Sequence, residues 1–321
     1  MAGQPWRALL ALLVGCVVLT GCAGLEAPAV AGPDAVPPRR PPNQPPSAYQ
    51  DRLTQLDQEL GAALTRVREA HDPQALEQAT LAIASVSSAA GERMRVDPGD
   101  PGVIRANTAL ANSLDQFGRE LAFLSQRVHE HEVCTGPAAV DMIATAPTMP
   151  ALRAVSRGLA LPGENGRTYR WGGSLPPTRD DLSSPPPAPV NGAILVDHRT
   201  PGQGEGVLEA RNEGTDAAVV FLARAGSALV VSVAVSSGQT AVVGGIPDGD
   251  YELAYTSGRD WDAADNGAFS RGCQFRRFTA PAPFRTEPMA GGTGYTVRTV
   301  VIRSGPADAA TADIPARQLP G

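Results

Sequence analysis

Two proline-rich segments limit what this chain of 321 residues can fold into. Residues 28–46 contain eight prolines, and residues 176–189 contain six. Proline fixes φ and has no amide hydrogen, so neither segment suits the interior of a helix or a sheet. Such segments favour extended polyproline II structure. We therefore expect folded blocks separated by a linker at 176–189 and preceded by a tether at 22–47.

The block after the tether has the periodicity of helices. Apolar residues between Tyr49 and Val67 recur three and four apart, and Asp72 followed by Pro73 predicts the start of a second helix. In a third helix apolar residues fall at heptad positions (Val103, Leu110, Phe117 and Leu124, with Leu114, Leu121 and Val128 between them). We predict an antiparallel, coiled-coil-like helical bundle over 48–134, followed by short helices from Thr135 and Met149 within 135–175.

Beyond residue 190 the pattern changes to short apolar runs separated by turn residues. The strand candidates are 193–197, 207–212, 217–223, 229–235, 240–243, 251–256, 275–278 and 295–302. Many short strands at regular spacing predict an antiparallel β-sandwich of the immunoglobulin-like kind over 190–303. The small, polar residues 304–321 predict a disordered tail. The expected fold class is α+β.

Three stretches of this block resemble a domain that is appended to assorted bacterial proteins of uncertain function. They are Ile246–Leu253, Gly258–Asp262 and Phe275–Phe278. The first also resembles a turn shared by carboxypeptidase-regulatory-like sandwiches. The resemblance implies an accessory β-sandwich and brings no catalytic residue with it.

The first 22 residues read as an export signal. Arg7 precedes an apolar run from Ala8 to Val18, which is short for a bilayer span of about 20 residues. Leu19-Thr20-Gly21-Cys22 resembles the lipobox of bacterial lipoproteins. The resemblance implies that 1–21 is a signal peptide, that Cys22 carries the lipid, and that the protein is anchored on the outer face of the cell membrane. The alternative is a signal peptide or signal anchor without a lipid.

Two cysteines remain once Cys22 carries a lipid and Cys16 has left with the signal. An oxidising exterior favours a disulfide between Cys134 and Cys273, and two buried free thiols are the alternative. Such a bridge would join the helical block to the strand block.

Two groups of residues have the composition of a metal site but not its spacing. His129, Glu130, His131 and Cys134 place two histidines two apart, about 200° around a helix, so both cannot face one ion. Asp260, Asp262, Asp265 and Asn266 precede Gly267, but position twelve of a calcium loop from Asp260 is Arg271 and not glutamate. We expect no metal, no cofactor and no catalytic residues.

The charge balance narrows the function further. The net charge is −6 and all 27 basic residues are arginine, which argues against nucleic-acid binding and excludes mechanisms that need lysine. We expect a non-enzymatic membrane-anchored lipoprotein that acts as a cell-envelope interaction or scaffold module and binds an unknown envelope protein. The alternative is a solute- or carbohydrate-binding lipoprotein, and a hydrolase with an unfamiliar site is a third hypothesis. Exposed aromatic residues (Tyr251, Tyr255, Trp261 and Tyr295) would favour the ligand-binding alternative, whereas a partly exposed heptad seam would favour a protein partner.

Overall fold

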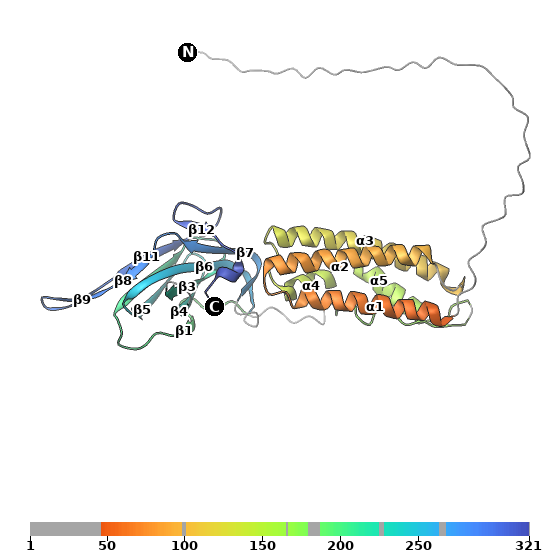
Figure 1. The fold of residues 1–321 in the computed structure, drawn as a ribbon, viewed down its shortest axis with the longest axis horizontal. Coiled ribbons are helices and arrows are strands. Elements are labelled where there is room, and N and C mark those ends of the chain that lie inside the picture. Colours follow the sequence, from red (N-terminus) through yellow and green to blue (C-terminus); the bar gives the residue numbers. More distant parts are fainter. Residues whose placement is uncertain are drawn as a thin grey trace, which may run out of the picture. The chain divides into compact units, whose positions relative to one another are not determined.

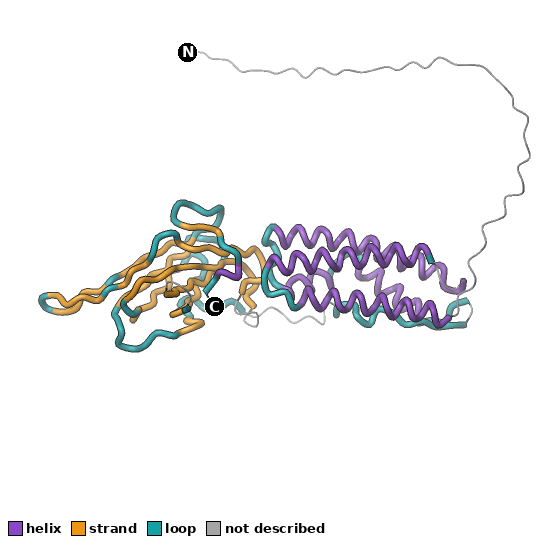
Figure 2. The backbone as a smooth tube through the Cα atoms, viewed as in Figure 1, coloured by secondary structure: helices purple, strands orange, loops and turns teal. Residues whose placement is uncertain are grey.

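The structure is a computed structural model that describes residues 46–97, 101–164, 166–178, 187–224, 228–262 and 268–320. These residues all belong to one compact unit. Helices come first and strands follow, so the fold is mixed α+β (Figure 1). Figure 2 shows that the α-helices and the strands occupy separate parts of the molecule, called here the helical part and the β part.

The helical part contains five helices among the described residues. They are α1 (Pro46–Arg68), α2 (Pro73–Val96), α3 (Ile104–His129), α4 (Gly136–Ala144) and α5 (Met149–Leu159). The predicted helix starts at Asp72 and Thr135 are confirmed, because the Asp72 carboxylate accepts a hydrogen bond from Ala75 N and the Thr135 hydroxyl accepts one from Ala138 N. Both helices then continue through a proline in their first turn.

The predicted apolar stripes form the core of the helical part. The stripe of α1 from Tyr49 to Val67 is buried, and every heptad residue from Val103 to Val128 is buried as well. The connection after α5 joins this core through Tyr169 and Trp171, and the rings of Tyr49 and Tyr169 meet edge to face with centroids 4.9 Å apart. The heptad seam is therefore fully covered within the chain.

Small residues bring α2 and α3 close together. A Cβ atom added at Gly91 on α2 would lie 2.8 Å from the carbonyl oxygen of Ala111 on α3. One added at Gly118 on α3 would lie 3.0 Å from the carbonyl oxygen of Ala84 on α2. The alanine-rich composition of α2 thus reflects close packing of two backbones.

The β part contains a larger and a smaller sheet. The larger has the order β1-β4-β3-β6-β7-β12, with β8 also paired to β6, and the smaller has the order β11-β2-β5. A two-stranded pair, β9 with β10, extends from them (Figure 1). The bounds are β1 (Ile194–Asp197), β2 (Gly206–Asn212), β3 (Ala217–Arg224), β4 (Leu229–Val235), β5 (Thr240–Ile246), β6 (Gly249–Asp262), β7 (Ala268–Phe278), β8 (Ala282–Phe284), β9 (Thr286–Met289), β10 (Gly292–Tyr295), β11 (Val297–Ile302) and β12 (Thr311–Asp313).

One buried core is shared by the two sheets. It contains Val220 of β3, Val233 of β4 and Tyr255 of β6 from the larger sheet. The smaller sheet contributes Leu208 of β2 and Val300 of β11. A second cluster, with Val219, Trp261 and Phe275, covers the opposite face of the larger sheet.

The predicted strands occur in the structure, but three details differ. Strands β6 and β7 extend well beyond 251–256 and 275–278, and the candidate 295–302 is divided between β10 and β11. The predicted all-antiparallel pairing is wrong at one place, because β11 runs parallel to β2. The chain reaches β11 only after the β9–β10 hairpin, and a crossover connection of this kind can return a strand in the parallel direction.

The prediction of a disordered tail over 304–321 is wrong for the described residues up to 320. Residues Thr311–Asp313 form β12, which pairs with β7, and Ile314 is buried. The buried guanidinium of Arg276 on β7 donates to the Asp313 carboxylate at 3.0 Å and also to the carbonyl oxygen of Gly305. Burial alone would lower the pKa of Arg276, but its hydrogen bonds to Tyr255 and Asp313 raise it. This single buried cation holds the tail at two points.

Candidate ligand pocket and disulfide junction

The loop that follows α3 pairs with β7 and joins the helical part to the β part. Cys273 N donates to His131 O at 3.0 Å, Gly272 N donates to Glu132 O at 3.3 Å, and Cys134 N donates to Ser270 O at 3.0 Å. His131 and Gly272 have φ values of 58° and 62°, in the left-handed region. The loop therefore covers the edge of β7 immediately before the segment that β12 covers.

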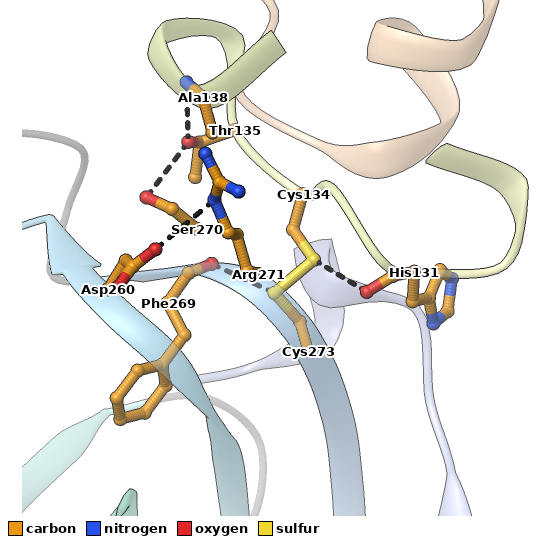
Figure 3. Close-up of a disulfide and its surroundings, with 9 residues drawn as sticks. All are labelled: His131, Cys134, Thr135, Ala138, Asp260, Phe269, Ser270, Arg271 and Cys273. Carbon is orange, nitrogen blue, oxygen red and sulfur yellow. Dashed lines mark hydrogen bonds and ion pairs between the residues drawn. A yellow bond between two sulfur atoms is a disulfide. The ribbon is translucent and has the colours of Figure 1, made fainter. Parts of the chain in front are cut away.

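A disulfide between Cys134 and Cys273 crosses this junction (Figure 3). The two Cα atoms lie 6.4 Å apart, within the range that a disulfide needs. The sulfur of Cys134 lies 3.2 Å from His131 O, and that of Cys273 lies 2.9 Å from Phe269 O. Because a disulfide sulfur carries no hydrogen, these are contacts and not hydrogen bonds. In the reduced protein the same carbonyl oxygens could accept from the two thiols.

Side chains add further links across the junction. The buried hydroxyl of Thr135, which caps α4, lies 3.1 Å from the hydroxyl of Ser270 on β7. The guanidinium of Arg271 lies between two carboxylates, with Nε 3.1 Å from Asp260 and Nη2 3.3 Å from Asp141 of α4. The junction thus combines a covalent bond, backbone pairing and an ion-pair bridge.

A pocket of about 850 Å³ lies beside the disulfide, over the outer face of the larger sheet. Its walls come from the sheet, from the loops before α2 and α4, and from the C-terminal tail. The apolar lining residues include Leu195, Val219, Phe221, Trp261, Phe275 and Leu319. A volume of this size falls within the range of about 300 to 1,000 Å³ that is common for small-molecule sites.

Six of the residues that line the pocket are polar (His71, Asp72, Thr135, Ser232, Thr256 and Arg317). At the sheet, the hydroxyl of Thr256 is buried and has no hydrogen-bond partner within the described residues. Leaving a buried hydroxyl without a partner costs about 1 to 3 kcal/mol. Elsewhere in the lining, Arg317 donates to Gln74 Oε1 at 3.1 Å, while the carboxylate of Asp72 caps α2. The pocket suits a ligand that is mostly apolar.

Beside the pocket, β1 is fixed by a charged pair at its end. The guanidinium of Arg199 donates to Asp197 at 2.6 and 2.8 Å and also to the carbonyl oxygen of Gly244 on β5. The side-chain hydrogen bond from Arg199 lowers the pKa of Asp197 to about 2. Because Gly244 belongs to the smaller sheet, Arg199 links the two sheets at the strand that contributes Leu195 to the pocket.

The residues of the first group considered as a metal site take separate roles. Cys134 is in the disulfide, the ring of His131 packs edge to face on Phe275, and His129 Nδ1 lies 3.3 Å from a carboxylate oxygen of Glu77. In the second group Asp260 pairs with Arg271, whereas Asp265, Asn266 and Gly267 lie outside the described residues. Cys22 and the lipobox also lie outside them. Across the described ranges no three His, Cys, Asp or Glu side chains gather as a metal site would require.

The aromatic residues considered for carbohydrate stacking do not form an exposed cluster. Tyr251, Tyr255 and Trp261 are buried, and Tyr295 on β10 is 49% exposed. Of the three buried residues, only Trp261 lines the pocket. Stacking on a sugar needs accessible ring faces, so the carbohydrate form of the ligand-binding hypothesis loses its support.

Sequence reasoning missed the pocket, although one signal was present. Strand β4 (LVVSVAV) is apolar at six of its seven positions and buried at all of them, and β3 is buried on both faces over most of its length. A continuous apolar run indicates a strand covered on both faces. The run could therefore have predicted a covering layer on the outer face of the larger sheet, but not the space left within it.

Comparison with known proteins gives no relative: no family model, curated protein or solved structure matches the chain. None of the helices in the described part of the chain is both long and apolar enough to cross a bilayer.

Proposed function

We propose that the protein is a non-enzymatic lipoprotein, anchored through Cys22 on the outer face of the cell membrane, that acts as an envelope interaction or scaffold module. In this proposal α1 to α3 form an antiparallel, coiled-coil-like bundle, and the two sheets form an immunoglobulin-like sandwich. The buried heptad residues support the bundle, and the core shared by the two sheets supports the sandwich. The tether over 22–47 would place both at a distance from the lipid.

The observation that carries the interaction role is an apolar surface at the β9–β10 hairpin and the neighbouring strands, called here the hairpin surface. It consists of Tyr295 on β10, 49% exposed, together with Val297 on β11 and Val242 on β5. Val297 lies beside Val207 of β2, and Val242 lies beside Glu209 of the same strand. Because residues two apart on a strand point to the same side, Val297 and Val242 share the outer face of the smaller sheet. Exposed apolar residues that gather in one region mark a site of protein association.

The junction supports the same role. A scaffold has to hold its binding surface in a fixed orientation, and the disulfide and backbone pairing at β7 restrict the motion of the β part against the helical part. The buried heptad seam leaves no comparable surface on the core-facing side of α3. The hairpin surface is therefore the better place to seek a protein partner.

Photo-cross-linking in living cells tests this proposal. A photoreactive phenylalanine analogue is placed at Tyr295, or at Phe123 on α3, which is 69% exposed and serves as the matched control. We expect a discrete adduct with an envelope protein from position 295 and none from position 123. In the Cys22→Ser chain, which should leave the membrane fraction, the adduct should be lost or much weaker. Equal labelling from both positions, or none from position 295, would contradict the interaction role.

A further inference from the structure

We infer that the pocket beside the disulfide is a binding site for a largely apolar small molecule. The inference does not depend on the proposed interaction role, because the hairpin surface and the pocket are formed by different residues. The pocket opens onto the outer face of the larger sheet, whereas Val242 and Val297 belong to the smaller sheet.

The chemistry of the walls determines the class of ligand. Four aromatic side chains from the sheet (Phe221, Trp261, Phe269 and Phe275) line the pocket together with Val219. Apolar surface of this kind is favourable to bury and offers no partner to a charged group. The part of the ligand that packs against the sheet is therefore uncharged and mainly hydrocarbon or aromatic.

The volume and the origin of the walls argue against an accidental packing gap. The pocket opens to solvent, and its volume of about 850 Å³ is far larger than one ordered water needs and lies within the range common for small-molecule sites. The walls come from four parts of the chain, and separate interactions fasten three of the elements that form them. The disulfide fixes the loop before α4, and a hydrogen bond from Ile314 N to Phe275 O fixes the tail. The hydrogen bond from Arg199 to the carbonyl oxygen of Gly244 fixes the end of β1.

One buried polar atom suggests that the ligand carries a hydrogen-bonding group. The hydroxyl of Thr256 belongs to the pocket wall and has no partner within the described residues. The side chain of its neighbour Tyr255 faces the core between the sheets, so Thr256 faces the pocket side of β6. A ligand with a single polar group, otherwise apolar, fits this arrangement.

Titration with the neutral dye Nile red, which becomes strongly fluorescent in apolar surroundings, tests the inference. The mature chain, residues 22–321 with Cys22→Ser, is used so that neither the apolar signal segment nor an acyl chain competes for the dye. We expect saturable binding of one dye per chain. Leu195→Asp places a charge at a pocket residue that is 38% exposed, so it should leave folding intact and weaken binding at least tenfold. Ser232→Phe, which fills the pocket from β4, should weaken binding to a similar extent.

The matched control is Val242→Asp, which places the same charge on an exposed valine of the smaller sheet. Its affinity for the dye should equal that of the parent chain, and circular dichroism should show that all variants melt cooperatively. The inference is overturned if binding is not saturable, if it survives Leu195→Asp, or if Val242→Asp weakens it equally. Should Ser232→Phe fail to fold, the comparison of Leu195→Asp with Val242→Asp still decides the outcome.

Discussion

At the scale of single residues, Arg276 shows how one buried charge can order a segment that has no pattern of its own. Its side chain is only 4% exposed, yet it contacts Asp313, Gly305 and Tyr255. A buried cation needs several partners, because an unpaired one pays the full cost of leaving water. The tail supplies two of these partners and is ordered as a result.

We expect Arg276→Met to lower the free energy of unfolding by about 1.5 to 3 kcal/mol, the range for hydrogen bonds to a charged group. The tail should also exchange its amide hydrogens faster around β12, because it loses both of its attachments. Urea unfolding and hydrogen exchange measure the two effects. Arg277→Met is the matched control, since Arg277 is half exposed and lies 3.9 Å from Glu252. A surface pair of this kind contributes at most about 1 kcal/mol. Equal effects from the two variants would contradict the role of Arg276.

At the scale of elements, the close contact of α2 with α3 depends on glycines that a helix would otherwise avoid. Glycine in a helix interior costs about 1 kcal/mol relative to alanine. Gly91 and Gly118 are nevertheless needed here. A Cβ atom added at either position would lie 3.0 Å or less from a backbone carbonyl oxygen of the other helix. Here packing outweighs helix propensity.

Whether a glycine-to-alanine change raises or lowers the free energy of unfolding should therefore depend on which helix face the glycine occupies. Gly91→Ala should lower the free energy of unfolding by about 1 to 2 kcal/mol, because overpacking costs more than the gain in helix propensity. Gly158→Ala on α5, where an added Cβ meets nothing within 4 Å, should raise it by about 0.5 to 1 kcal/mol. Thermal or urea unfolding of the two variants makes the comparison. If Gly91→Ala is also stabilising, the two helices are farther apart than the structure indicates.

The elements were largely predictable because their signals are local. The apolar stripe from Tyr49 to Val67 and the N-cap at Asp72 depend on residues within one or two turns, and the structure has both. The tail and the parallel pairing of β11 with β2 depend on contacts between distant residues, such as Arg276 with Asp313, which no local period records. The pocket was missed for the same reason, since its walls come together from four separate regions of the chain.

At the scale of the whole molecule, the disulfide turns a long intervening segment into a closed loop. Cys134 and Cys273 are 139 residues apart in sequence, and the loop between them includes the linker and most of the β part. Closing a loop of this length reduces the chain entropy of the unfolded state, which raises the free energy of that state by about 5 kcal/mol at 25 °C. The stabilisation measured for disulfides is typically about 2 to 4 kcal/mol. Backbone pairing between residues 131–134 and 270–273 shares the task of holding the junction in the folded state.

We expect the double variant Cys134→Ser/Cys273→Ser to unfold at lower urea concentration, with a loss of about 3 to 5 kcal/mol in the free energy of unfolding. The folded junction should persist, because the serine hydroxyls can donate to His131 O and Phe269 O, the carbonyl oxygens that the sulfurs contact. Reduction of the parent chain should reproduce the loss, whereas reducing agent should leave the double variant unchanged.

Mass spectrometry of a non-reducing digest should find the two cysteine peptides joined. Because Cys134 lines the pocket, the double variant should also bind Nile red more weakly than the parent. An unchanged free energy of unfolding in the double variant would mean that backbone pairing alone holds the two parts together.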